Sequence, residues 1–203
     1  MRMKLIRLLF SGLILALAGN AYGNETDTSR LRKWYLPHYI PIQFAGNVGF
    51  LSTGIGYTSK ALNYNLEVLY GYVPRSAGGE VIHTVTAKNY FPFGRFPLKN
   101  RRSLIPYLGI GLSMEIGGNS FFIQPRYFPD SYYDFPKNLH VIAYGGARVQ
   151  HMFEKEGGVI RGVEFFAEGG TVDVYIWYKA ISSQIKFHQI FTLAIGGNLL
   201  LKR

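Results

Sequence analysis

Five histidines are the side chains of this 203-residue chain best suited to acid–base chemistry: His38, His83, His140, His151 and His188. A histidine beside Ser, Asp or Glu can act as a base that activates a nucleophile or a water molecule. Of the five, His83 and His140 are expected near one rim of the fold, where Asp130, Ser131 and Asp134 of a neighbouring connection could approach them. No pair has a diagnostic catalytic spacing, so we interpret these residues as interfacial or loop histidines and assign no catalytic residue.

Composition excludes several other chemistries. The chain has no cysteine, which excludes a disulfide framework, a thiolate metal site and a cysteine nucleophile. His-x-x-x-His spacing is also absent, so we expect neither a metal nor a cofactor. Six glycine doublets occur, and none is followed by the Lys-Ser/Thr of a phosphate-binding loop. They indicate turns, bulges and close strand approach, with a register shift expected at Gly169-Gly170.

Six charged residues lie within segments that otherwise alternate apolar and small residues. These are Glu67, Lys88, Glu115, Arg148, Glu164 and Glu168. If the segments are strands of an eight-stranded barrel, side chains just fill the interior, and charges there need partners. We predict a structural network of ion pairs that fills the lumen. The alternative is a narrow conducting path or a proton-handling pair such as Glu164 with Glu168.

Basic residues outnumber acidic ones, 22 to 12, for a formal net charge of +10. Four of them fall in the connection 94–103: Arg95, Lys99, Arg101 and Arg102. In an exported protein the anionic partners are lipid headgroups or lipopolysaccharide phosphates, and nucleic acid is excluded. We predict contact with anionic headgroups here. A solvated basic loop that sets the topology is the alternative.

A second connection, 118–137, is rich in aromatic residues and is stiffened by Pro125, Pro129 and Pro136. Its rings include Phe121, Phe122, Tyr127, Phe128, Tyr132 and Tyr133. Exposed rings on a stiff loop can form a contact surface for a protein, glycan or lipid. The alternative is a loop that buries these rings over the barrel mouth.

The first 23 residues have the three zones of a secretory signal peptide. Arg2, Lys4 and Arg7 form the basic start, the apolar stretch runs over 8–18, and small residues follow. This apolar stretch is shorter than the roughly twenty residues that span a bilayer as a helix. We therefore predict export, with cleavage after Ala18 or Gly23, and a β-barrel domain over 24–203.

Beyond the signal peptide, period-two alternation recurs in segments of about ten residues. Between Leu108 and Ile116, for example, every second residue is apolar, and the residues between them are Gly109, Gly111, Ser113 and Glu115. The predicted strands are 34–45, 47–58, 62–73, 80–93, 104–117, 138–153, 162–178 and 188–201. A single long strand from Ile42 to Tyr57 would reduce the count to seven. Bacterial barrels of one chain have even strand numbers, which favours eight.

Alternation of this kind suits either a soluble sandwich or barrel, or a transmembrane barrel with its apolar face toward lipid. Three observations favour lipid: the export signal, a second face of Gly, Ser, Thr and isolated charges, and Tyr and Phe clustered at strand ends. With a periplasmic N-terminus, the long connection 118–137 faces outward, as such barrels prefer. We predict an all-β, eight-stranded antiparallel transmembrane β-barrel.

The export signal, the repeated strands and the Gly54-Ile55-Gly56-Tyr57 strand end resemble small outer-membrane β-barrel proteins of Gram-negative bacteria. The Tyr70-Gly71-Tyr72-Val73-Pro74 strand end is similar to members without an assigned function. The resemblance implies a monomer in the cell outer membrane, in contact with outer-membrane lipids and lipopolysaccharide. We predict a structural or surface-interaction role without catalysis. The alternatives are a lipid A- or phospholipid-modifying hydrolase or acyltransferase at the outer rim, and a narrow pore.

Overall fold

The structure is a computed structural model that describes residues 35–59, 63–117, 138–153, 159–182 and 184–202. The compact unit that contains them begins at Tyr35. The predicted signal peptide and the aromatic connection 118–137 lie outside the described residues.

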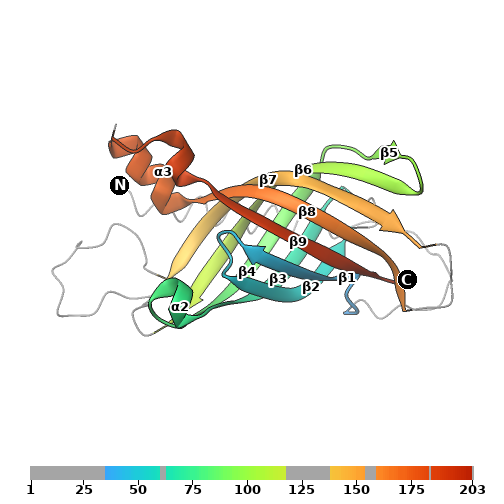
Figure 1. The fold of residues 1–203 in the computed structure, drawn as a ribbon, viewed down its shortest axis with the longest axis horizontal. Coiled ribbons are helices and arrows are strands. Elements are labelled where there is room, and N and C mark those ends of the chain that lie inside the picture. Colours follow the sequence, from blue (N-terminus) through green and yellow to red (C-terminus); the bar gives the residue numbers. More distant parts are fainter. Residues whose placement is uncertain (1–34, 60–62, 118–137, 154–158, 183, 203) are drawn as a thin grey trace. The chain divides into compact units, whose positions relative to one another are not determined.

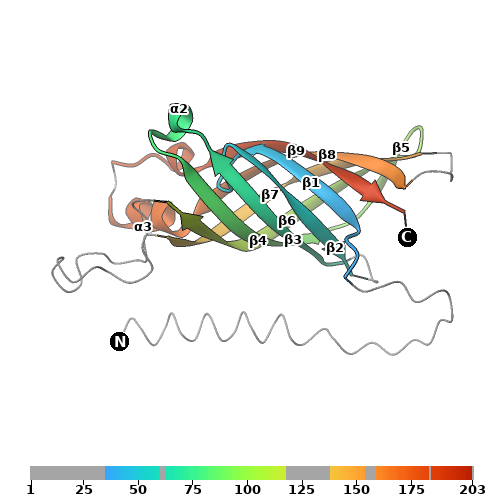
Figure 2. The same cartoon turned by 90° about the horizontal axis from the view of Figure 1, so that it is seen from below.

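Eight antiparallel strands close into one barrel (Figures 1 and 2). They are β1 (Tyr39–Ala45), β2 (Leu51–Thr58), β3 (Asn65–Val73), β4 (Ile82–Pro92), β6 (Arg102–Ile116), β7 (Leu139–Met152), β8 (Ile160–Val172) and β9 (Thr192–Leu201). Neighbours along the chain pair with one another, and the β1–β9 pairing completes the ring. The short β5 (Phe96–Leu98) pairs only with the beginning of β6. The predicted eight-stranded antiparallel barrel is confirmed.

A tight turn separates β1 from β2, so the alternative of one long strand from Ile42 to Tyr57 is wrong. Phe44 pairs with Leu51, and the chain reverses over the residues between them. Ala45 and Gly46 have φ angles of 62° and 82°, the left-handed conformation that a tight reversal uses. Glycine adopts this conformation at little cost, which helps to place the turn here.

The predicted strand 162–178 is wrong in its last six residues, because β8 ends at Val172 and a helix follows, α3 (Asp173–Ile181). The Asp173 carboxylate accepts hydrogen bonds from the Val141 N–H of β7 and from the Val174 N–H, which ends the strand and begins the helix. The expected register shift at Gly169-Gly170 is also wrong, since the irregularity lies between Ile160 and Gly162. A 3₁₀ helix, η1 (Phe187–Ile190), then precedes β9, whose predicted start at 188 was four residues early.

The two ends of the barrel differ. At the terminal end, β1, β3, β6 and β8 begin and β2, β4, β7 and β9 end. At the loop end are the turn 46–50, the helix α2 (Arg75–Gly78), the end of β6, the start of β7, and the helices α3 and η1. In the part of the chain that the structure describes, no helix is long and apolar enough to span a membrane.

Polar and aromatic side chains, with aliphatic ones such as Leu69 and Ile142, fill the barrel, and apolar side chains cover it. Each of the eight barrel strands buries a polar residue: Gln43, Ser52, Glu67, Lys88, Ser113, Arg148, Glu168 and Asn198. Each strand also exposes a large apolar one: Phe44, Ile55, Val68, Val85, Leu108, Val149, Phe165 and Ile195. This arrangement is the reverse of a soluble protein, which buries its apolar surface.

Three interior rings fit because each lies opposite a glycine. Tyr39 pairs with Gly56, Tyr144 with Gly109, and Phe166 with Gly196, and all three rings are buried. A Cβ atom on any of these glycines would come within 2.1–2.4 Å of the opposite ring. The glycines therefore create the space that lets bulky rings pack inside a narrow barrel.

Candidate functional site

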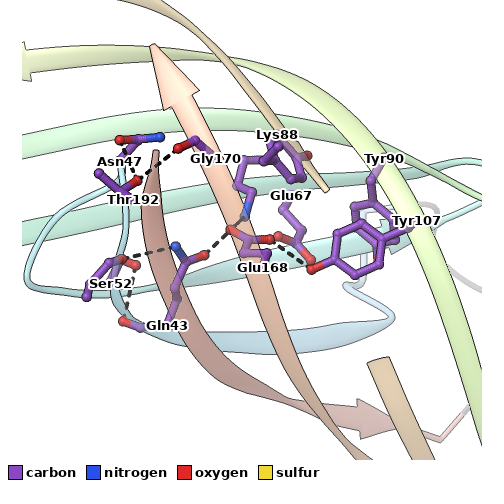
Figure 3. A network of polar contacts seen from close by, with 12 residues as sticks. Gln43, Asn47, Ser52, Glu67, Lys88, Tyr90, Tyr107, Glu168, Gly170 and Thr192 are labelled. Atoms are coloured by element: carbon purple, nitrogen blue, oxygen red, sulfur yellow. Dashed lines mark hydrogen bonds and ion pairs between the residues drawn. The ribbon is translucent and has the colours of Figure 1, made fainter. Parts of the chain in front are cut away.

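Lys88 of β4 is the centre of one half of the interior network (Figure 3). Its Nζ donates to Glu168 Oε1 at 2.5 Å and to Gln43 Oε1 at 3.1 Å. The ammonium also lies 4.3 Å from the centre of the Tyr144 ring, within the range of a cation–π contact. Tyr107 donates its hydroxyl to the other Glu168 oxygen at 2.9 Å. The buried ammonium and carboxylate are thus both provided with polar partners.

Arg148 of β7 is the centre of the other half. Its Nη2 lies 3.2 Å from Glu67 Oε1, its Nη1 lies 3.6 Å from Glu164 Oε2, and Nη1 also donates to the Tyr90 hydroxyl. The guanidinium carbon stacks 3.6 Å from the centre of the Tyr90 ring. Tyr39 donates to Glu67 at 3.1 Å, so this carboxylate has two donors.

Amide side chains complete the network around Glu164. Gln150 Nε2 donates to one Glu164 oxygen at 2.7 Å and Asn198 Nδ2 to the other at 2.8 Å. These donors matter because the five charged residues in the network comprise two cations and three carboxylates. Neutral amide and hydroxyl donors can stabilise the carboxylate for which no cation is left.

The structure brings together five of the six predicted lumen residues and separates the sixth. Glu67, Lys88, Arg148, Glu164 and Glu168 are each no more than 7% exposed. Glu115 instead lines a cavity at the loop end. Sequence reasoning missed the uncharged members, Tyr39, Gln43, Tyr90, Tyr107, Gln150 and Asn198, although their inward strand positions could have identified them.

The four predicted headgroup contacts lie together in the connection between β4 and β6 and at the start of β6. Arg95 Nη1 donates to the interior residue Gln150 at 2.6 Å, and Arg95 lines a cavity of about 60 Å³ at the terminal end. Lys99, Arg101 and Arg102 are exposed at the turn from β5 into β6. Arg95 is exposed as well, so all four basic side chains can reach an anionic surface.

At the loop end the barrel opens into a cup of about 540 Å³. Thr84, Ser113, Glu115 and His140 supply polar groups to its wall, and Tyr175 of α3 lies on one side. The cup is thus large enough for a small molecule at the mouth of the closed lumen, with an imidazole, a carboxyl and several hydroxyl groups on its wall.

His140 in this cup has a carboxylate partner, Asp173. The Nδ1 and Oδ1 atoms are 3.3 Å apart, and both side chains are about one-fifth exposed, at 18% and 23%. Burial of Asp173 favours its neutral form, but hydrogen bonds from His140 and from the Val141 and Val174 N–H groups outweigh it and lower the pKa of Asp173. Asp173 is therefore a stable anion that can orient the imidazole.

Ser113 lies directly opposite His140 in the register of β6 and β7. Side chains in that relation stand on the same face of a sheet, with Cβ atoms about 5 Å apart. The Ser113 hydroxyl shares a 2.8 Å hydrogen bond with Thr86. The predicted partners Asp130, Ser131 and Asp134 lie outside the described residues. Sequence reasoning missed Asp173 because the residue was assigned to the middle of a strand.

His83, the other candidate, does not join this group. It pairs with Tyr70, whose hydroxyl lies 2.6 Å from His83 Nδ1, on the apolar outer surface. Within the described segments, no three His, Asp or Glu side chains gather as a metal site would require.

The chain matches no family model, no curated protein and no solved structure. A function is therefore inferred from its own fold and side chains.

Proposed function

We propose that this protein is an outer-membrane β-barrel with a closed lumen and a structural or surface-interaction role. The inverted arrangement of side chains carries this proposal: each of the eight barrel strands presents a large apolar residue outward and a buried polar residue inward. An apolar exterior is costly in water and stable among acyl chains. Barrel closure also pairs the backbone groups of every strand, so none is left unpaired in the hydrocarbon.

The spacing of aromatic residues along the barrel also supports a location in a lipid bilayer. Tyr64 stands at the terminal end of β3 and Tyr72 near its loop end. Eight residue steps of about 3.3 Å, tilted by about 40°, separate them by about 20 Å along the barrel axis. That separation is close to the height of the apolar band in such barrels, about 25 Å, whose edges carry aromatic girdles.

The lumen network argues against a pore. Arg148 and Lys88 are each no more than 2% exposed and cross the interior to residues of other strands. Both halves of the network occupy the space that a water path would need. With the lumen filled, a contact role falls to the loops, and the connection 118–137 is the proposed contact surface.

Location, processing and partners belong to the same proposal. We expect export by a signal peptide cleaved after Ala18 or Gly23, insertion as a monomer, and contact with outer-membrane lipids, including lipopolysaccharide. Arg95, Lys99, Arg101 and Arg102 would meet anionic headgroups. The mass of the protein in the outer-membrane fraction reports both location and cleavage site, and recovery in the soluble periplasmic fraction would contradict the proposal.

Planar-bilayer recording tests the closed lumen. Protein refolded in detergent, with the heat-modifiable gel mobility of a folded barrel, should add no steady conductance after insertion. A stable, salt-dependent single-channel current from the heat-modifiable species would overturn the non-conducting role in favour of the narrow pore.

The pair His140–Asp173 favours a second candidate function, a hydrolase acting on membrane-lipid esters. After leaving its hydrogen bond with Thr86, the Ser113 hydroxyl would attack the ester carbonyl carbon while its proton passes to His140. The intermediate then loses the alcohol, which takes that proton. Water gives a proton to His140 and splits the acyl–Ser113 bond, which releases the carboxylic acid and restores the hydroxyl. An acceptor alcohol in place of water would make the protein an acyltransferase.

Ester hydrolysis and lipid A mass spectrometry separate the two candidates. Refolded wild-type protein is compared with S113A and H140A on a p-nitrophenyl ester and on phospholipid vesicles. S52A is the matched control, because Ser52 is another buried interior serine. Hydrolysis lost in S113A and H140A but kept in S52A establishes the hydrolase. No hydrolysis and an unchanged lipid A profile leave the non-enzymatic role.

A further inference from the structure

The helix α3 has an unusual composition for a connection at the rim of a barrel. Of its nine residues, Asp173–Ile181, only Asp173 and Lys179 are charged, and the other seven are apolar or aromatic. Not one of the nine is buried. Tyr175, Ile176, Tyr178 and Ile181 are 43–64% exposed, so the helix carries apolar surface that the barrel does not cover.

The following segment extends this apolar surface. Phe187 is 67% and Phe191 43% exposed, and their rings pack together with centroids 5.1 Å apart. The Ser182 N–H donates a hydrogen bond to the Tyr178 carbonyl oxygen at the end of α3. The next elements along the chain are η1 and β9. Helix and 3₁₀ turn contact each other and thus form one apolar patch, with Lys179, Lys186 and His188 as its basic residues. Its exposed apolar members are Tyr175, Ile176, Tyr178, Ile181, Phe187 and Phe191.

The first turn of α3 is held in place. Asp173 bonds His140 and the Val141 N–H of β7, and α3 also contacts β8. Beyond this attachment α3 extends at the loop end, next to the end of β8 (Figures 1 and 2). Leu193, three residues after η1 ends at Ile190, is 78% exposed on the apolar outer surface of the barrel.

We propose that α3 and η1 lie in the lipid interface beside the barrel, with their rings among the headgroups and upper acyl chains of the leaflet at the loop end. The inference rests on the proposed membrane location. A short helix that is apolar around most of its surface and is rich in Tyr and Trp suits the interface.

Lipid fits this patch better than a protein partner does, for two reasons. The patch continues into the apolar outer surface of β9, so a bilayer around the barrel reaches it without a further binding event. Its few charges are mostly basic, Lys179, Lys186 and His188, which suits the anionic groups of a lipid surface. Long basic side chains can extend to headgroups while their stems stay in apolar surroundings.

The chain offers a natural reporter, because it has only two tryptophans and one of them is Trp177 of α3. In the variant W34F, Trp177 is the only tryptophan. The full chain is refolded into phosphatidylcholine vesicles that contain lipid brominated on the acyl chains, near the headgroup or near the bilayer centre. A belt reporter, W34F/W177F/I195W, places tryptophan on the apolar outer surface of the barrel instead.

We expect bromine near the headgroup to quench most of the Trp177 emission and to quench it more than bromine at the bilayer centre does. Bromine at either depth should quench the tryptophan of the belt reporter. In W34F carrying I176D and I181D, Trp177 quenching should fall sharply, whereas W34F/K179Q should keep it. Heat-modifiable mobility verifies that each variant is folded.

The remaining outcomes overturn one proposal or both. A quenched belt reporter with unquenched Trp177 overturns the interfacial helix and leaves the membrane location intact, and blue-shifted but unquenched emission would show a protein surface covering α3. If neither tryptophan is quenched in folded protein, the membrane location and this inference fail together.

Discussion

Lys88 and Glu168 show how a charge is tolerated inside a barrel. Each is held by more than its ionic partner: Lys88 by Gln43 and the Tyr144 ring, and Glu168 by Tyr107. Desolvation opposes burial of both ions, so the pair is stable because these additional contacts replace water. The cost of disturbing the pair then depends on whether one charge or both are removed.

We expect K88M to lower the unfolding free energy by about 3–5 kcal/mol, because the Glu168 carboxylate stays buried without its cation. K88M/E168Q should recover much of that loss, since no unpaired charge remains. Denaturant unfolding of the refolded barrel measures both variants. A double variant as unstable as K88M would show that Lys88 acts through packing rather than charge.

Asp173 gives a second prediction at this scale. Its pKa is lowered in the fold, so its contacts contribute stability above the pKa of an unfolded aspartate, about 3.9, and this contribution is lost as the pH falls through the folded pKa. D173N should lower the unfolding free energy by about 1–3 kcal/mol near neutral pH, because the charge-assisted hydrogen bonds weaken.

As the pH falls below the folded pKa of Asp173, the D173N and wild-type curves should converge, because the wild-type carboxyl is then protonated. Unfolding as a function of pH checks this, with K179Q on the same helix as control. A difference that stays constant down to the lowest pH would contradict the assignment.

Among the elements, the strands depend on glycine as much as on apolar residues. Gly56, Gly109 and Gly196 each stand opposite an inward ring. A Cβ at Gly196 would lie 2.4 Å from both the Phe166 ring and the Ile42 carbonyl, whereas one at Gly169 would meet nothing closer than 3.8 Å. The two positions therefore form a matched test on neighbouring strands.

G196A should destabilise the barrel by about 1–3 kcal/mol through overpacking. G169A should be neutral or stabilise it by up to about 1 kcal/mol, because alanine reduces the entropy of the unfolded chain. Denaturant midpoints of the two variants measure the difference. Equal effects would mean that the interior rings can move aside freely.

Alternation was sufficient to predict the eight strands and five interior charges, because a period of two assigns each residue to a face. It could not predict α3, since Val172, Val174 and Ile176 alternate as a strand would, and the helix begins only because Asp173 bonds Val141 across the sheet. For the same reason the pairing of His140 with Asp173 could not be predicted. Contacts between residues 33 positions apart depend on where β8 ends.

At the scale of the whole molecule, the outer surface distinguishes lipid from water as the surroundings. Ile195 lies near the middle of β9 and is 59% exposed. In water, a substitution at such an exposed position changes stability by no more than about 0.5 kcal/mol. In a bilayer, a basic residue near the midplane costs about 2–4 kcal/mol, and near the interface about 0–1 kcal/mol.

We therefore expect I195R to lower the unfolding free energy in phosphatidylcholine vesicles by about 2–4 kcal/mol. V81R is the control, because Val81 is exposed in the connection between α2 and β4 at the loop end, where an arginine reaches headgroups. The difference between the two variants measures depth in the bilayer rather than the general effect of an added charge. Equal and small effects would mean that water surrounds the apolar face of the barrel, and the proposed membrane location would then have to be abandoned.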